Sequence, residues 1–277
     1  MRSERSGDPA PERPPVADLH VHTTASDGIL EVSELADAAR AGDVDVVAVT
    51  DHNRVHPKLD APVQPIGGVT VIRGIELRVD AGEQRLDLLG YGLAVTDRIE
   101  SVTSRIQRNR KQRGAEIVAR VEDRLGVDLD IELREGIGRP NIARAIEASD
   151  APYDFDAAFE ELIGNGRPCY VERYVPSFSV GAEVLRESCA VVALAHPFRY
   201  PDPESALERA RELDAVERFY PYSGSSAQKE ERELLDDVAA DADLLSTGGS
   251  DAHDRTLGVA GPPSAEFESF AARLPGV

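Results

Sequence analysis

The sequence predicts an α/β fold built on parallel strands, and two observations carry this prediction. The segment Val44–Thr50 is dominated by β-branched residues, which is typical of a strand buried on both faces. Strand-like runs alternate with segments of helical spacing over the first hundred residues, and this alternation resumes after residue 180. Such alternation indicates strands joined by crossover helices around a parallel sheet.

The first hundred residues contain one helix candidate and several strand candidates. The helix candidate Val32–Ala41 ends at Gly42, a residue suited to a helix C-terminus. The strand candidates are Val16–Val21, Val44–Thr50, Val69–Ile75 and Gln84–Leu93, of which we interpret the last as an added strand.

The middle of the chain is helical throughout. A long helix is predicted over Asp97–Leu125, with basic residues clustered at Arg105–Arg113. Two shorter helices follow, Arg139–Ala148 with Pro140 in its first turn, and Asp154–Ile163 capped by Asp154. We therefore expect a small helical insertion over about residues 97–167, between two strands of a barrel that occupies residues 16–277.

The alternation of helices and strands resumes in the last hundred residues. The expected helices are Val180–Ser188, Pro203–Leu213 and Ala227–Ala240, and the expected strands are Ala190–Ala195, Ala215–Tyr220 and Asp243–Thr247. Residues 1–15 are rich in Pro, Arg and Glu and have no apolar segment, so we expect a flexible tail rather than a signal peptide.

The charge of the chain excludes several classes of partner. The 51 acidic residues outnumber the 31 basic ones, which gives a net charge of −20. This charge argues against binding to long nucleic acid or to an anionic membrane, and nothing indicates an obligate protein partner. All but three of the basic residues are arginine, and such a composition is typical of halophilic organisms. We expect a cytoplasmic protein, since the two cysteines make no disulfide framework and no apolar run could span a membrane.

The positions of the histidines indicate a metal site. The chain has six histidines, and five of them follow or end strand candidates: His20, His22, His52, His196 and His253. The carboxylates Glu76 and Asp251 also follow strand candidates. In a closed parallel barrel the carboxyl ends of the strands meet at one rim, where active sites are built. Because these ligands are too many for one ion and include no cysteine, we expect two or three ions of Mn, Zn or Fe. Taken one at a time, these residues could instead be solvated strand ends, a turn or a buried salt-bridge partner.

Five short motifs together resemble the PHP (polymerase and histidinol phosphatase) family. They occur in the family's order and span about residues 16–260: Asp18-Leu-His20-Val-His22 with Asp27, Thr50-Asp51-His52, Gly74-Ile-Glu76, Ala195-His196-Pro197 and Gly249-Ser250-Asp251-Ala-His253. The resemblance implies a distorted seven-stranded (β/α) barrel and a metal-dependent phosphoesterase activity. The helical insertion is similar to that of the nucleoside bisphosphate phosphatases and short-RNA 5′-exonucleases of the family.

The resemblance also implies a ligand set for each metal. His20, His22, Glu76 and Asp251 would hold one ion. Glu76 would bridge to a second ion that His196 also binds, and Asp27, His52 and His253 would hold a third. The same subgroup carries a further ligand for the second ion, which we place at Asn141 in Gly138-Arg139-Pro140-Asn141. An amide oxygen is a weaker ligand than imidazole, so that site would be weak, or Asn141 would merely cap its helix.

The expected reaction is hydrolysis of a phosphate ester by a metal-bridged hydroxide, with Glu76 and Asp251 as catalytic residues and Asp251 handling the proton. Arg139, Arg173 and Arg199 are the candidates for binding the substrate phosphate, since guanidinium groups match phosphate in geometry. The Arg105–Arg113 cluster could guide a second phosphate, or it could be a solvated helix face paired with acids.

Three functional hypotheses remain open at this stage. The substrate could be a nucleoside 3′,5′-bisphosphate or a short oligonucleotide end. It could instead be another small phosphate ester, such as histidinol phosphate. The chain could also be a metal-binding module without turnover. The helical insertion favours the first hypothesis over the second.

Overall fold

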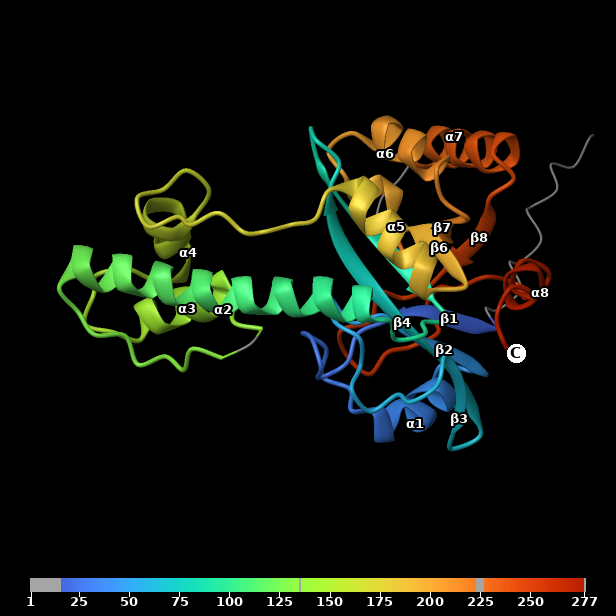
Figure 1. The fold of residues 1–277 in the computed structure, drawn as a ribbon, viewed down its shortest axis with the longest axis horizontal. Coiled ribbons are helices and arrows are strands. Elements are labelled where there is room, and N and C mark those ends of the chain that lie inside the picture. Colours follow the sequence, from blue (N-terminus) through green and yellow to red (C-terminus); the bar gives the residue numbers. More distant parts are fainter. Residues whose placement is uncertain (1–15, 135, 223–226, 277) are drawn as a thin grey trace, which may run out of the picture.

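A single curled sheet organises the molecule. The computed structural model describes residues 16–134, 136–222 and 227–276, so the tail expected over residues 1–15 lies outside the described residues. Seven strands form the main path of the sheet in the order β1 (Ala17–Val21), β2 (Val46–Val49), β4 (Val69–Asp80), β5 (Arg85–Tyr91), β6 (Val191–Leu194), β7 (Ala215–Phe219) and β8 (Leu245–Gly248). The expected distorted barrel of seven strands is confirmed (Figure 1).

Contacts between the first strand and the chain after the last strand bring the two edges of the sheet together. Val21 forms a parallel bridge with Ala252. His22 N donates to Ala252 O at 2.9 Å, and Ala252 N donates to His20 O at 3.3 Å. These bonds join the two segments that carry the His20/His22 and Asp251/His253 motifs.

The strand expected as an addition over Gln84–Leu93, β5, is where the sheet departs from the parallel arrangement. This strand pairs antiparallel with β4 on one side and with β6 on the other, whereas the remaining neighbours along the main path are parallel. The reason is the connection, because residues 81–84 form a turn too short for a crossover. Strand β4 also continues to Asp80 rather than stopping at Ile75, so Glu76 lies inside the strand.

A short hairpin strand was not expected. Strand β3 (Val63–Ile66) pairs antiparallel with the start of β4 across Gly67 and Gly68, both of which have positive φ angles. Its pattern was hard to recognise because it contains a proline and is only partly buried.

Helices cover the outer face of the sheet. They are α1 (Leu35–Ala41), preceded by the 3-10 turn η1 (Val32–Glu34), and then α5 (Phe178–Ser188), α6 (Pro203–Ala210), α7 (Ala227–Asp241) and α8 (Ser264–Ala271). Figure 1 shows α1 beside β2 and β3, and α6 and α7 beside β7 and β8. Helix α8, which the sequence analysis did not anticipate, packs against β8.

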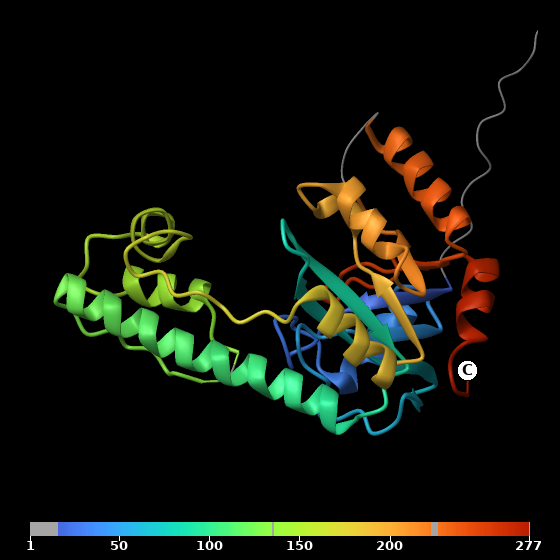
Figure 2. The ribbon, with the colours of Figure 1, turned by 45° about the horizontal axis from the view of Figure 1, so that its top comes forward.

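The helical segment between β5 and β6 reaches away from the sheet. Its long helix α2 (Asp97–Leu125) has the predicted bounds, with Thr96 accepting a hydrogen bond from Ile99 N at the start and Gly126 in the left-handed conformation at the end. Helix α3 (Arg139–Glu147), the short α4 (Phe155–Ala157) and the π-helix η2 (Ala158–Ile163) lie beside the far half of α2 (Figures 1 and 2).

This segment has a hydrophobic cluster of its own. Ile117 and Val121 of α2 pack with Ile142 and Ile146 of α3 and with Leu162, and none of these side chains belongs to the clusters that the strands form. None of the helices in residues 16–134, 136–222 and 227–276 combines the length and the apolar character needed to cross a bilayer.

Asp18 ties β1 to the chain that follows β8. Its carboxylate is fully buried and accepts backbone hydrogen bonds from His20 at 3.3 Å, from Ser250 at 2.9 Å and from Gly258 at 2.9 Å. Each of these amide groups would be left without this acceptor if the carboxylate were removed.

We expect Asp18→Ala to lower the free energy of unfolding by about 3 kcal/mol, because buried donors that lose their acceptor carry the desolvation cost. Chemical denaturation monitored by circular dichroism measures this change. The control is Asp37→Ala, since Asp37 is exposed and pairs with Arg40 on the same helix, and it should change stability by less than about 0.5 kcal/mol. A loss below about 1 kcal/mol for Asp18→Ala would contradict the role assigned to this carboxylate.

Candidate metal centre

Histidines and carboxylates gather at the carboxyl ends of β1, β2, β6 and β8 and around Glu76 of β4. The structure places all eight residues expected to hold metals in adjoining groups: His20, His22, Asp27, His52, Glu76, His196, Asp251 and His253. Within each of three groups, one ligand atom from every member lies within 4.8 Å of the others.

The first group contains His20, His22 and Asp251. Asp251 Oδ1 lies 3.1 Å from His22 Nε2 and 3.5 Å from His20 Nε2. His20 lies on β1 and His22 directly after it, and because they are two residues apart in extended chain their side chains project to the same side. Asp251 reaches them from the loop after β8 with φ at 52°, a backbone conformation uncommon outside glycine, asparagine and aspartate.

The second group contains Glu76, His196 and Asp87. His196 Nε2 lies 3.0 Å from Glu76 Oε1 and 3.9 Å from Asp87 Oδ2. The sequence analysis missed Asp87, which lies on β5 and receives a two-pronged ion pair from Arg78. The sequence contained a sign of this role, since Asp87 is a carboxylate that interrupts the apolar residues of its strand.

The third group contains His22, Asp27, His52 and His253. Asp27 lies 3.6 Å from His52 Nε2 and 3.5 Å from His253 Nε2. Its loop is ordered by the buried carboxylate of Asp51, which accepts hydrogen bonds from the backbone and hydroxyl of Thr23 and from Ser26. The third group is the most exposed of the three, with Asp27 56% accessible.

A buried glutamate that sequence reasoning missed orients two of the histidines. Glu217 of β7 is fully buried and lies 2.9 Å from His20 Nδ1 through one oxygen. Its other oxygen accepts a hydrogen bond from the backbone of His196 at 2.7 Å. A carboxylate on Nδ1 leaves His20 Nε2 free to face the centre, which is how such carboxylates commonly prepare histidines for metals.

The closeness of histidines and carboxylates in the centre shifts the pKa values of both. Burial alone would lower the pKa of His52, but the neighbouring carboxylate of Glu76, 2.5 Å away, raises it to about 9. Burial alone would raise the pKa of Glu76, and the charges of His52 and His20 reverse this effect and hold it well below its usual range. Burial also works against ionisation of Asp27, yet the hydrogen bond from His253 and the nearby His52 bring its pKa to about 2.

Several buried polar atoms in the centre have no hydrogen-bond partner among the described residues. They are His20 Nε2, His22 Nδ1 and His196 Nδ1. An unpaired buried polar atom costs about 1–3 kcal/mol, and native structures retain few of them. Nitrogen and oxygen donors without cysteine suit divalent ions such as Mn, Zn or Fe, so the donor set and its unpaired atoms fit metal ions at this place.

Of the three arginines expected to bind phosphate, Arg199 lies closest to the centre. Its Nη1 donates to Asp251 Oδ2 at 2.7 Å, and the Tyr220 hydroxyl donates to the same oxygen at 2.9 Å. Arg173 lies in the segment that returns from the helical insertion, among other arginines.

Two predicted residues do not join the centre. Arg139 is turned into the helical segment, where it donates to Ile163 O and to Asn165 Oδ1. Asn141 lies at the start of α3, where its Oδ1 accepts a hydrogen bond from Gly138 N and caps the helix. The third member of the second group is Asp87 instead.

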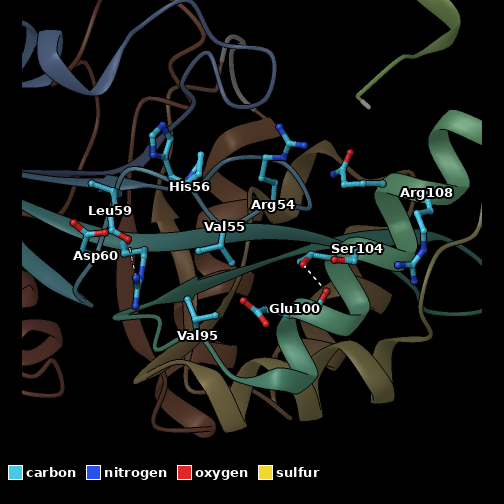
Figure 3. Close-up of a pocket in the computed structure, with 13 residues that line it drawn as sticks. Arg54, Val55, His56, Leu59, Asp60, Val95, Glu100, Ser104 and Arg108 are labelled. Carbon is cyan, nitrogen blue, oxygen red and sulfur yellow. Dashed lines mark hydrogen bonds between the residues drawn. The ribbon is translucent and has the colours of Figure 1, made fainter. Parts of the chain in front are cut away.

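A pocket of about 760 Å³ lies between the loop after β2 and helix α2. Figure 3 shows Arg54 and His56 on the loop side and Glu100, Ser104 and Arg108 on the helix side. None of the three ligand groups lines this pocket. Asn53 links the pocket to the third ligand group. It follows His52 in the chain, and its carbonyl accepts a hydrogen bond from Gln107, which lines the pocket.

A comparison with family models decides which family the fold and these groups belong to. The model of the PHP domain matches residues 18–157. The chain belongs to the PHP domain family. It is a metal-dependent phosphoesterase of that family, and its buried His, Asp and Glu groups agree with this class.

Curated relatives of the chain act on nucleotides or RNA by name. A 5′-3′ exoribonuclease of Haemophilus influenzae is 26% identical over 252 residues, which cover 85% of this chain and 89% of the relative. A 3′,5′-nucleoside bisphosphate phosphatase of Chromobacterium violaceum is 26% identical over 200 residues, covering 69% of this chain and 70% of the relative.

A solved structure has the same fold. A Bifidobacterium adolescentis protein assigned as a metal-dependent phosphoesterase superimposes with a TM-score of 0.69 at 22% identity, over 96% of this chain and 99% of the other. An amidohydrolase from Chromobacterium violaceum matches with a TM-score of 0.68 at 20% identity, over 93% of this chain and 96% of the other.

The raised pKa of His52 predicts a pH-dependent metal affinity. A histidine must lose its proton before it binds a metal, and His52 in the metal-free protein keeps its proton up to about pH 9. We therefore expect the affinity for Mn²⁺ or Zn²⁺ to rise about tenfold or more per pH unit between pH 6.5 and 8, measured by competition with a chelating dye.

The stability of the metal-free fold changes with pH in the opposite direction to the metal affinity. The pair of protonated His52 and Glu76 stabilises the metal-free fold fully below pH 6.5, and this contribution is lost as the pH rises through about 9. A metal affinity that is flat between pH 6.5 and 8 would contradict this assignment. His56→Ala serves as the control, because His56 is buried outside the three groups and its loss should leave the pH slope in place.

Proposed function

We propose that the protein hydrolyses a phosphate ester of a nucleotide, either a nucleoside 3′,5′-bisphosphate or the 5′ end of a short oligonucleotide, with two or three divalent ions. The observation that carries this proposal is the convergence of three ligand groups around the single carboxylate of Glu76. The names of the relatives from Haemophilus influenzae and Chromobacterium violaceum support the class of substrate.

We assign the ligands group by group. His20, His22, Asp251 and Glu76 would hold the first ion, and Asp27, His52 and His253 would hold the third. The second ion is held by Glu76, His196 and Asp87, with Asp87 in the place first given to Asn141. Carboxylate oxygens are hard ligands, so Asp87 favours Mn or Fe over a softer ion at this position.

When bound, the ions supply Lewis acids for the phosphoryl oxygens and lower the pKa of a water molecule towards neutrality. Glu76 is placed to be shared between two ligand groups, because its Oε2 faces His52 and its Oε1 faces His196. Asp251 is placed to take a proton, since its Oδ1 faces the histidines and its Oδ2 is held by Arg199 and Tyr220. The Arg199 side chain is half exposed, and because its Nη1 donates to Asp251 and Tyr220, its other N–H groups would bind a non-bridging oxygen of the reacting phosphate.

A different small phosphate ester, such as histidinol phosphate, is the alternative substrate. The helical segment between β5 and β6 favours the nucleotide, because Arg110 and Arg113 of α2 lie near Arg173 and add positive charge that a small amino alcohol would not need.

We expect the protein to hydrolyse a nucleoside 3′,5′-bisphosphate and a 5′-phosphorylated dinucleotide at least about tenfold more efficiently than histidinol phosphate. Released phosphate or mononucleotide is measured with Mn²⁺, Zn²⁺ or Mg²⁺ at high salt. Glu76→Gln is the matched control, and it should lower the rate by about 10³ or more because it removes the charge shared by the groups. Bound metal without turnover on any of these esters would overturn the proposal.

The ligand assignment makes a separate prediction about metal content. Asp87→Asn keeps the size of the side chain and a hydrogen-bond acceptor for Arg78 but removes the charge. It should weaken the binding of one ion by at least about tenfold, as measured by elemental analysis after dialysis. The comparison variant Asn141→His should leave the metal content unchanged. A gain of metal in Asn141→His would restore Asn141 to the ligand set.

A further inference from the structure

The pocket between the loop after β2 and helix α2 is separate from the metal centre, since none of the three ligand groups lines it. Its volume of about 760 Å³ is in the range of sites for small molecules. Helix α2 lines it with residues that are three or four positions apart and therefore share one face of the helix. These residues are Glu100, Thr103, Ser104, Gln107 and Arg108.

Arg73 is a buried cation in the wall of this pocket, at the end where Leu59 lies. The residue is 5% exposed, and its side chain donates through Nε to Leu93 O and through Nη1 to Leu59 O, each at 2.7 Å. Within residues 16–134, 136–222 and 227–276, Arg73 forms no ion pair with a carboxylate, and its Nη2 donates to no residue. A buried charge without a counter-ion is costly. An anionic group in the pocket would supply the missing partner.

Gln107 contributes a second buried polar group with unused bonding capacity. The residue is 6% exposed, and its Nε2 donates to Asn53 O at 3.1 Å, which fixes the orientation of the amide. Its Oε1 is buried and accepts no hydrogen bond from any residue in the described part of the chain. An N–H group of a molecule in the pocket would satisfy this oxygen.

Apolar side chains lie between the two ends of the pocket. Figure 3 shows Val55 and Val95 between Leu59 on one side and Ser104 on the other. Val95 is 45% exposed, although large apolar side chains in this chain are mostly buried. An apolar part of a ligand would cover these valines, and such burial is favourable.

The charges around the pocket favour a ligand with one negative charge. Three arginines and two carboxylates line it, which leaves one net positive charge: Arg54, Arg73, Arg108, Asp60 and Glu100. His56 adds no charge near neutral pH, because burial lowers its pKa. Asp60 and Glu100 would repel a doubly charged phosphate more strongly than a carboxylate, so a carboxylate is the better match.

We propose that this pocket binds a small carboxylate that also carries an N–H group and an apolar side group, which is the chemistry of an amino-acid derivative. Its carboxylate binds the free N–H groups of Arg73, because a guanidinium offers parallel donors that match carboxylate oxygens. Its N–H group donates to Gln107 Oε1, and its apolar group covers Val55 and Val95. The site goes beyond the proposed function, because it needs neither the metal ions nor a phosphate ester.

The test is a titration of the full-length, isotope-labelled protein with N-acetyl-L-leucine, followed by NMR in the presence of Mg²⁺. We expect a Kd of about 2 mM or lower, from the binding energy per atom that small ligands reach. The Nε–H signal of Arg73 and the side-chain amide signal of Gln107 should shift together. N-acetyl-L-leucinamide, which lacks the carboxylate, should bind at least about tenfold more weakly, because a hydrogen bond between charged groups is lost.

Two substitutions test the contacts themselves. Arg73→Gln should weaken the binding of N-acetyl-L-leucine by at least about tenfold, and Gln107→Met should weaken it by roughly two- to tenfold. Arg73 also holds two backbone carbonyls, so a further variant keeps the test open if Arg73→Gln does not fold. Ser104→Trp places an indole in the pocket and should abolish binding. Ser101→Trp is the matched control, since Ser101 is exposed on the same helix and does not line the pocket.

Several outcomes would overturn the proposal. One is the absence of binding of both N-acetyl-L-leucine and N-acetylglycine up to about 10 mM. Another is equal affinity for N-acetyl-L-leucinamide or for inorganic phosphate, because the first would mean that the carboxylate is not recognised and the second that any anion binds. Shifts confined to the histidines of the metal centre, or unchanged binding in Ser104→Trp, would place the carboxylate outside this pocket.

Discussion

Glu76 is a buried carboxylate surrounded by histidines from different parts of the chain. Its oxygens lie between 2.5 and 3.7 Å from nitrogens of His20, His22, His52 and His196. A charge in such a place is costly unless other charges or ions compensate it. The fold meets this requirement because the ends of the strands lie close together, which places the four histidines around the carboxylate of Glu76.

Three further buried carboxylates fix the positions of the segments that carry the ligands, although they are not members of the three ligand groups. Glu217 bridges the histidine of β1 and the backbone of His196 after β6. Asp51 orders the loop that carries Asp27, and Asp18 fastens β1 to the segment after β8. Much of the negative charge inside the barrel is therefore structural, and each of these carboxylates accepts hydrogen bonds from specific donors. This arrangement explains how three ligand groups keep separate geometries within a few ångströms.

The sequence was informative where chemistry and periodicity agree. The histidine pairs, Glu76 and the helix Asp97–Leu125 were predictable, because strand ends and long amphipathic helices leave clear patterns. Asp87 and Glu217 were not recognised, since a single acid inside an apolar run does not show which face of the sheet it occupies. The antiparallel direction of β5 depends on the length of one turn, and the sequence left open whether Asn141 binds a metal or caps α3, where its Oδ1 accepts a hydrogen bond from Gly138 N. These features are decided by tertiary contacts.

The helical segment between β5 and β6 packs around its own apolar side chains, and the metal ligands assigned to the protein all come from the strands and their loops. Changes on the surface of α2 or of the returning segment can therefore leave the packing of the strands intact. The near half of α2 still packs with the strands through Ile99 and Ile106, so this freedom to change belongs to the far half of the segment. A barrel that keeps its ligand groups can therefore tolerate sequence change in that far half without losing the packing of the strands.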